Sequence, residues 1–284
     1  MIEHFGLKIG DSEIGYKLTR ENYARINKKS TFETGKIYDE DFCRNHAINC
    51  LINFDYNMAY FKSLNVKKFN SEIDKFLKRN PQFKPVQNLN EYKNKPGFYL
   101  MVLDDYCQAY LGGSKDVHRR IHDHWIKQKP FDRLIFVSID TSIISIDSFR
   151  PLDTTRLYVF MIDDTYTYED RYIGSVKSMF MCNRTIGGRL EGGLQEAIAN
   201  RKERQLIGTN LESSIKIKYA EDLNPSPVQL HEIYMEVNGS HFLMNTDLDG
   251  EISNIAEWKF SGIYGTYTIV SNLVEHLVTV KEIS

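Results

Sequence analysis

GFYLMVLDDYCQAYLGGSKDVHRRIHDHW, residues 97–125, is the stretch of the chain that decides the predicted fold. It begins with two β-rich runs, residues 97–103 and 106–112, which flank the polar pair Asp104-Asp105. Two such runs joined by so short a polar loop predict an antiparallel hairpin. Helical periodicity follows at once, so the stretch predicts a strand, a turn, a second strand and a helix in close succession.

The helix predicted after the hairpin has a cap and two distinct faces. Asp116 can cap its first turn, because a short side-chain oxygen accepts backbone N–H groups there. Three apolar residues then follow at a spacing of one helical turn and share a buried face: Val117, Ile121 and Trp125. Arg120 and His124 lie together on an adjacent face.

Outward from this stretch, the pattern predicts further elements on both sides. LIFVSI at 134–139 and TRLYVFMI at 155–162 are predicted strands, and 168–180 is a predicted helix that Gly174 weakens. Apolar residues fall at helical spacing across 39–77, before a connection rich in helix-breaking prolines. Strand-like runs occupy the last part of the chain: SIKIKYA, HEIYMEV, SHFLM and GTYTIV.

Three regions are predicted from this order of elements. Residues 1–90 form a mainly helical region, 91–185 a central domain, and 186–284 a C-terminal mixed α/β region. The predicted fold class is α/β (α+β), with a small mixed β-sheet flanked by helices and additions at both ends.

The composition indicates an ordered globular protein and limits the possible partners. Hydrophobic residues make up 42% of the 284 positions, which is enough apolar surface for a core. Thirty-six Lys and Arg stand against 38 Asp and Glu, a formal charge of -2, so a site for a polyanion must be a local basic patch. The four cysteines are scattered, and we expect reduced thiols in a cytoplasmic protein without a signal peptide or a membrane span.

The hairpin carries two triplets, Gly97-Phe98-Tyr99 and Tyr110-Leu111-Gly112, followed by Arg120 and His124 on the predicted helix. In order, spacing and context these residues resemble the GIY-YIG nuclease family. Literal copies of the two name motifs also occur elsewhere, at 172–174 and 262–264, but in the reverse order and without matching surroundings. The resemblance implies the fold of that nuclease domain for residues 91–185 and a metal-dependent endonuclease that hydrolyses DNA.

The resemblance also implies a metal-binding glutamate on a later helix, followed by an asparagine that closes the domain. Glu169 with Asn183 is the best match, although an extra segment at about 140–165 precedes this helix and the proline often found before the asparagine is missing. Glu196 and Asp153 are the alternatives for the acid.

Each residue type suits a step of phosphodiester hydrolysis, which needs a deprotonated water, neutralised phosphate charge and help for the leaving oxygen. Glu169 would hold one Mg²⁺ or Mn²⁺, a hard cation that binds carboxylate oxygen together with water and phosphate. Tyr99 would be the general base, with His124 hydrogen bonded to it or relaying its proton. Arg120 would bind phosphate oxygens, and Tyr110 would orient phosphate or water.

Basic residues around the motif predict contacts with nucleic acid at Lys115, Arg119 and Lys127. DNA is the expected partner, with RNA and branched substrates as alternatives. His118 and His122 have the spacing of a helical zinc pair but lack a third ligand in the sequence. Two rivals remain: a non-catalytic nucleic-acid-binding module with a GIY-YIG-like fold, and an unrelated structural protein whose corresponding residues would not cluster.

Overall fold

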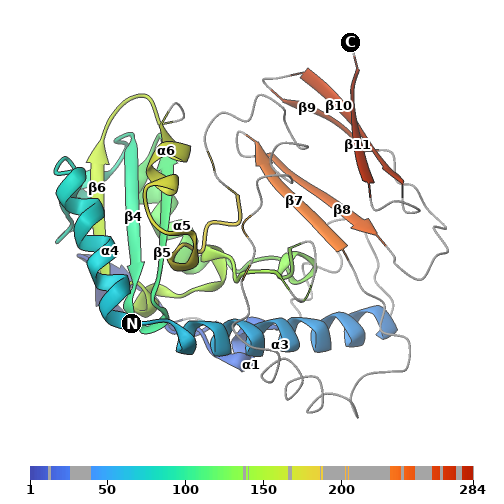
Figure 1. The fold of residues 1–284 in the computed structure, drawn as a ribbon, viewed down its shortest axis with the longest axis horizontal. Coiled ribbons are helices and arrows are strands. Elements are labelled where there is room, and N and C mark those ends of the chain that lie inside the picture. The colour runs from blue at the N-terminus through green and yellow to red at the C-terminus, as the bar shows by residue number, and fades with distance from the viewer. Residues whose placement is uncertain are drawn as a thin grey trace.

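The computed structural model describes residues 1–11, 14–25, 40–136, 139, 141–165, 168–185, 187, 202 and 204, and beyond them the backbone of five strands in 231–283. The described chain mixes α-helices with small antiparallel sheets (Figure 1). Of its helices, none is both long and apolar enough to span a lipid bilayer. All four cysteines are free thiols.

The centre of the fold is a four-stranded sheet in the order β3-β6-β4-β5. Its strands are β3 (Lys84–Pro85), β4 (Gly97–Leu103), β5 (Gln108–Ser114) and β6 (Arg156–Met161), and β6, β4 and β5 lie side by side in Figure 1. The predicted hairpin is confirmed as β4 and β5, and the predicted strand at 155–162 is confirmed as β6.

The sheet is antiparallel at every pairing of named strands, so the prediction of a mixed sheet is wrong in this respect. A turn joins β4 to β5, and the chain then returns along the other edge of β4 as β6, opposite in direction. Among the described residues the one parallel pairing is an isolated bridge from Ala109 in β5 to Met181.

Two glycines of the hairpin motif are required by close approaches. A Cβ on Gly97 would lie 2.5 Å from the carbonyl oxygen of Phe160 in β6. A Cβ on Gly112 would lie 2.5 Å from the Tyr99 hydroxyl oxygen and 2.9 Å from the Tyr110 ring. Only glycine leaves room at these positions, so the motif glycines hold β6 close and keep space between the two tyrosines.

The predicted helix after the hairpin is α5 (Val117–Ile126). The Asp116 side chain caps it by accepting the Arg119 backbone N–H at 3.0 Å. The predicted apolar face is buried, because Val117, Ile121 and Trp125 are each at most 1% exposed. The capped helix therefore packs one face on the core, and its exposed residues are Arg119 and Ile126.

Two helices precede the sheet and confirm the helical pattern of 39–77. The first, α3 (Glu40–Ser63), runs along one end of the sheet, and α4 (Val66–Arg79) lies beside β6 and β4 (Figure 1). Three aromatic and aliphatic residues of α4 are fully buried: Phe69, Ile73 and Phe76. They share one hydrophobic cluster with residues of the sheet and α5. Ahead of these helices come a hairpin of β1 (Ile2–His4) and β2 (Leu7–Ile9) and the single-turn α1 (Arg20–Tyr23).

The strand predicted at 134–139 is wrong within the described residues. Phe131–Arg133 is a 3-10 turn, and residues 134–136 pair with no strand. Backbone groups of the predicted strand bond to side chains instead. The carbonyl of Leu134 accepts from Tyr23 and Arg184, and the carbonyl of Ile139 accepts from Asn53. An apolar run can thus be buried as a loop where polar side chains satisfy its backbone.

The helix predicted at 168–180 is shorter than expected. It is α6 (Glu169–Gly174) followed by a 3-10 turn at Ser178–Phe180, and Gly174 is the last helical residue. Glu169 is the first helical residue, so its side chain lies at the end of α6 that faces β5.

The C-terminal region contributes five strands to the described residues. A hairpin pairs β7 (His231–Val237) with β8 (Ser240–Thr246), and a three-stranded sheet joins β9 (Trp258–Gly262), β10 (Gly265–Asn272) and β11 (Leu277–Ile283). The predicted strands HEIYMEV, SHFLM and GTYTIV are confirmed as β7, β8 and β10. SIKIKYA lies outside the described residues.

Candidate functional site

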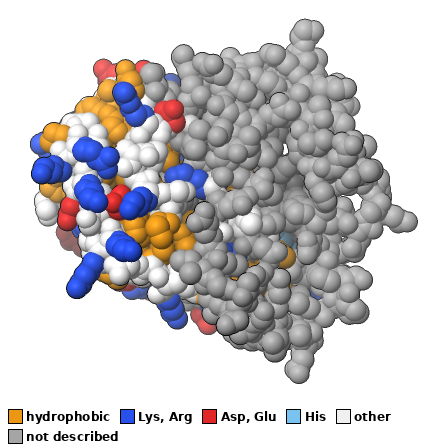
Figure 2. Space-filling view, in the orientation of Figure 1, with side chains coloured by type: hydrophobic (Ala, Val, Ile, Leu, Met, Phe, Trp, Pro, Cys, Tyr) orange, Lys and Arg blue, Asp and Glu red, His pale blue; other side chains and the backbone are white. Residues whose placement is uncertain are grey.

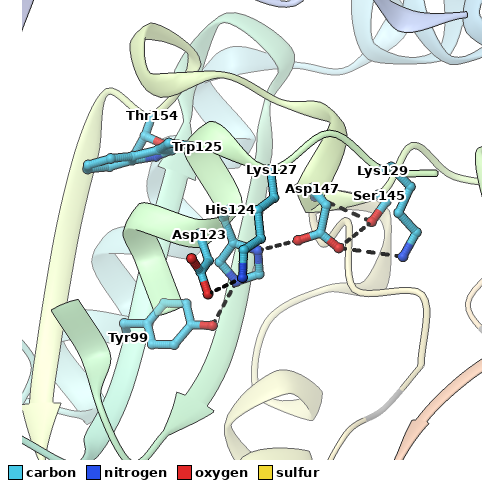
Figure 3. Close-up of polar contacts among 9 residues, drawn as sticks. All are labelled: Tyr99, Asp123, His124, Trp125, Lys127, Lys129, Ser145, Asp147 and Thr154. Atoms are coloured by element: carbon cyan, nitrogen blue, oxygen red, sulfur yellow. Dashed lines mark hydrogen bonds and ion pairs between the residues drawn. The ribbon is translucent and has the colours of Figure 1, made fainter. Parts of the chain in front are cut away.

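A buried tyrosine–histidine pair forms the centre of the candidate site. Tyr99 projects from β4 and is 1% exposed, and its hydroxyl oxygen lies 2.9 Å from His124 Nε2 on α5 (Figure 3). The pairing of β4 with β5 sets Tyr99 opposite Gly112, and the buried face of α5 turns His124 toward the sheet. The predicted contact between Tyr99 and His124 is therefore present.

The other ring nitrogen of His124 is bonded to an aspartate that the sequence did not indicate. His124 Nδ1 lies 2.6 Å from Asp147 Oδ1 (Figure 3). Asp147 belongs to a 3-10 turn at Ile146–Ser148, within the segment at 140–165 that we interpreted as an insertion. Three side chains from three parts of the chain thus form one continuous hydrogen-bonded row, Tyr99–His124–Asp147.

The second carboxylate oxygen of Asp147 faces further polar groups. Lys129 Nζ and the Ser145 hydroxyl each lie 3.5 Å from Oδ2 (Figure 3). The side chain of Lys129 is only 3% exposed. Burial acts to raise the pKa of Asp147, but the adjacent His124 and the positive charges of Lys129 and Arg120 hold it well below its usual range. Asp147 is therefore ionised across ordinary pH.

Tyr110 lies beside the tyrosine–histidine pair. Its ring centroid lies 6.2 Å from that of Tyr99 and 5.2 Å from that of His124. Burial raises the pKa of Tyr110 well above its ordinary value, and Tyr99 and Glu169 add to this through their negative forms, whereas Arg120 opposes it. Arg120 and Glu169 thus act electrostatically on the same tyrosine.

Glu169 is anchored directly beside the hairpin. Its Oε1 accepts the backbone N–H of Gly113 at 3.0 Å, next to Gly112, which touches both tyrosines. The half-buried carboxylate has a second oxygen, and a hard cation that keeps most of its waters needs only one or two carboxylates. The donor set therefore fits Mg²⁺ or Mn²⁺ held by Glu169, water and substrate, and no group of three His, Cys, Asp or Glu suited to a metal occurs among the described residues.

Asn183 ties the chain after α6 to the edge of the sheet. Its side-chain amide accepts the N–H of Leu111 at 3.1 Å and donates to the carbonyl of Leu111 at 2.7 Å. The neighbouring Cys182 N–H donates to the Ala109 carbonyl at 2.9 Å. These bonds cover the exposed edge of β5 and fix the segment that follows Glu169, as the resemblance implies for this asparagine.

Of the two alternative acids, the structure describes Asp153, which does not join this site. Asp153 is fully buried and accepts hydrogen bonds from the Leu18 N–H, the Arg150 N–H and the Tyr106 hydroxyl. Its carboxylate is thereby enclosed in the core, where no substrate could reach it. Glu196 lies outside the described residues.

The predicted nucleic-acid-binding residues are all exposed: Lys115, Arg119 and Lys127. Lys127 also pairs with Asp123 at 2.8 Å (Figure 3). In Figure 2, Lys and Arg side chains also gather over α4, whose exposed residues include Lys67, Lys75 and Lys78. The rings of His118 and His122 are stacked at 6.3 Å.

No motif in the sequence points to Asp147 or to its contact with Lys129. Asp147 follows no motif and is distant from His124 along the chain. Nothing in the sequence distinguishes Lys129 from the other basic residues near it. No protein-family model matches the chain, and no curated protein or solved structure is significantly similar to it.

Proposed function

We propose that this protein is a metal-dependent endonuclease of the GIY-YIG type that hydrolyses DNA phosphodiester bonds. The observation that carries the proposal is the hydrogen bond of 2.9 Å between the Tyr99 hydroxyl and His124 Nε2. A phenol so placed has a proton acceptor at hand, which a packing tyrosine does not need. The charges of Arg120 and Glu169 both act on Tyr110, whose ring lies beside those of Tyr99 and His124.

In this proposal Tyr99 takes a proton from the attacking water. A free phenol has a pKa of about 10, so it acts as a base near neutral pH only if a neighbour takes its own proton. His124 Nε2 can do so, and it lies within hydrogen-bond distance. The resulting tyrosinate then accepts the proton of the water as the oxygen attacks phosphorus.

The remaining residues act on the charge that develops on the phosphate. Arg120 presents a permanently charged fork suited to the non-bridging oxygens. Tyr110 stays protonated, because burial raises its pKa, and so it donates a hydrogen bond to phosphate or water. Glu169 would hold Mg²⁺ or Mn²⁺, which, when bound, supplies Lewis acidity and stabilises the leaving oxygen.

DNA is the proposed substrate because the basic residues form local patches on a chain of net charge -2. Lys115, Arg119 and Lys127 are exposed at and just beyond the two ends of α5, which carries Arg120 and His124. Contacts of this kind bind backbone phosphate irrespective of sequence. Binding should therefore weaken steeply as salt is raised.

The test is cleavage of supercoiled plasmid, single-stranded DNA and RNA with Mg²⁺ or Mn²⁺, before and after chelation by EDTA. Wild type is compared with Glu169→Gln and with its matched control Asp170→Asn, the exposed neighbour on α6. We expect EDTA and Glu169→Gln each to abolish cleavage, and Asp170→Asn to leave it within about twofold, since surface substitutions away from a site change little.

Cleavage that survives both EDTA and Glu169→Gln would exclude the metal-dependent mechanism. Salt-sensitive binding to DNA without cleavage of any substrate would instead favour a non-catalytic nucleic-acid-binding module. Preferential cleavage of RNA or of branched DNA would support the same mechanism with a substrate other than the one proposed.

A further inference from the structure

We propose that Asp147 is a positioning residue: it holds His124 in the one tautomer whose Nε2 can accept the Tyr99 proton, and Lys129 holds Asp147 in place. This inference rests on the proposed function of Tyr99 as a base, but its first readout does not need cleavage. It assigns a role to a residue outside the hairpin and helix that carry the family resemblance.

The tautomer follows from the two contacts of the ring. Asp147 is ionised and can only accept, so at 2.6 Å from it His124 Nδ1 must carry a proton. A neutral imidazole has one N–H, and Nε2 is therefore the bare nitrogen, 2.9 Å from the Tyr99 hydroxyl, which donates to it. Without Asp147 nothing in this row would select that tautomer.

Lys129 orients the carboxylate of Asp147. Its ammonium group is almost fully buried and lies 3.5 Å from Asp147 Oδ2, where the Ser145 hydroxyl also lies at 3.5 Å. With Oδ2 facing these donors, Oδ1 is turned to His124. The buried cation also favours the ionised form of the acid, which is the form that accepts from Nδ1.

Side chains from α3 fix the loop that carries Asp147. Asn57 accepts the Ile144 N–H at 3.1 Å and donates to the Ser142 carbonyl at 2.9 Å. Asn53 donates to the same carbonyl at 2.8 Å. Both asparagines are fully buried on a helix that also packs Phe54 and Phe61 on the core. These buried hydrogen bonds restrain the loop and, with it, the side chain of Asp147.

The proton transfer balances within this row. The Tyr99 O–H bond breaks and its proton joins His124 Nε2, which gives a tyrosinate beside an imidazolium. The Nδ1 proton stays between His124 and Asp147, whose negative charge stabilises the imidazolium. The tyrosinate takes a proton from water, the oxygen of that water attacks phosphorus, and the departing oxygen receives its proton from solvent. His124 then returns its Nε2 proton to solvent.

The first experiment is long-range ¹H–¹⁵N correlation on the full chain with ¹⁵N-labelled histidine, with His124 assigned by its loss in His124→Gln. Wild type should show His124 with Nδ1 protonated and Nε2 bare. In Asp147→Asn the amide oxygen should turn to Lys129, which can only donate, and the NH₂ group to His124. Nδ1 must then accept, so the tautomer should invert. Asp147→Glu should retain the wild-type tautomer.

Single-turnover cleavage supplies the second readout. We expect the maximal rate to fall at least about 100-fold in Asp147→Asn with substrate affinity within about twofold, and Asp147→Glu to recover part of the rate. Asp153→Asn is the matched control, the same exchange at a buried acid of the same segment, and it should change neither the tautomer nor the rate.

Several results would overturn the inference. Wild-type His124 with a bare Nδ1 would do so even if the variants did not fold, and so would an unchanged tautomer in folded Asp147→Asn. If Asp147→Asn inverts the tautomer but cleaves at the wild-type rate, Asp147 has no role in catalysis, provided that Tyr99→Phe abolishes cleavage. If wild type cleaves nothing, the proposed function fails, and the tautomers alone still decide whether Asp147 positions His124.

Discussion

Asp147 and Asp153 lie in one short segment between α5 and β6, yet their surroundings differ in kind. Asp153 is fully buried and accepts from two backbone N–H groups and the Tyr106 hydroxyl, and burial raises its pKa. Asp147 has 23% of its side chain exposed and faces a histidine and a buried lysine, which hold its pKa well below the usual range. The more deeply buried acid joins backbone segments, whereas the other acid faces groups that can exchange protons.

Each acid is also linked to a tyrosine of the same hairpin region. Tyr106, in the turn, donates directly to Asp153 at 2.8 Å, and Tyr99, on β4, reaches Asp147 only through His124. Burial, reinforced by the charge of Asp153, raises the pKa of Tyr106, so that its proton stays in place. A buried carboxylate therefore indicates a reactive site only when a titratable group connects it to the reacting atom.

The largest expected effect separates the two tyrosines. Tyr99→Phe should lower the cleavage rate about 10³-fold, since it removes the general base, and the free energy of unfolding by about 1 kcal/mol, because the buried His124 loses its donor. Tyr106→Phe should leave the rate unchanged and lower the free energy of unfolding by about 1–2 kcal/mol, because it deprives a buried acid of a donor. Single-turnover cleavage and urea unfolding measure the two quantities. Equal losses of rate in both variants would erase the distinction.

Asp153→Ala should have the largest effect on stability. It leaves two buried N–H groups and a buried hydroxyl without their acceptor, so we expect the free energy of unfolding to fall by about 3–4 kcal/mol. His124 should keep its tautomer in the fraction that remains folded. Urea unfolding checks the first expectation and histidine NMR the second, and a variant as stable as wild type would show that Asp153 does not hold the Leu18 segment to the hairpin turn.

Lys129→Met should have a smaller effect, on the other acid. Removing the ammonium group leaves Asp147 with less compensation, but that acid keeps His124 and some contact with water, so we expect a loss of about 2 kcal/mol in the free energy of unfolding. The cleavage rate should also fall, because the Asp147 carboxylate is no longer held toward His124. If urea unfolding is unchanged while the His124 tautomer becomes mixed, Lys129 orients Asp147 without stabilising the fold.

The two acids also show how far the sequence could predict this molecule. Periodicity and turn residues predicted the hairpin, α5 and β6, because these depend on local pattern and one short connection. The family resemblance, not periodicity, pointed to the contact of Tyr99 with His124. Residues 134–136 are equally apolar but form a loop, because Tyr23 and Arg184 from distant parts of the chain donate to the Leu134 carbonyl there.

Asp147 was missed for the same physical reason. Its position depends on Asn53 and Asn57 of α3, which bond the loop before it, and on Lys129, whose burial the sequence does not reveal. Asparagines spaced one helical turn apart, such as Asn53 and Asn57, are the one sequence feature that could have suggested these contacts. If such amides are buried, they need partners from outside their helix. The partner segment itself could not be identified from the sequence.

The pH dependence of stability should have opposite signs at the two acids. Asp147 has a lowered pKa in the folded state, so it contributes stability above the unfolded value of about 3.9 and loses it as pH falls further. Asp153 has a raised pKa, so its contribution is greatest below about 3.9 and declines as pH rises to the folded value. Compared with wild type, Asp147→Asn should therefore lose less free energy of unfolding as pH falls. Asp153→Asn should gain more free energy of unfolding as pH rises. Urea unfolding across acidic pH measures both. The same change in both variants would mean that the acids share one environment.

The smallest expected effect is at a lysine near Asp153. Lys17 pairs with Asp105 at 2.6 Å on the surface, with both side chains about half exposed, and its charge also acts on Asp153. An exposed pair of this kind is screened by water and salt, so Lys17→Met should lower the free energy of unfolding by about 0.5 kcal/mol or less. The same substitution at Lys129 should cost several times more, since that ammonium group is buried. Equal effects of the two substitutions in urea unfolding would mean that Lys129 is solvated in solution, and the row from Asp147 to Tyr99 would then lack the cation that orients it.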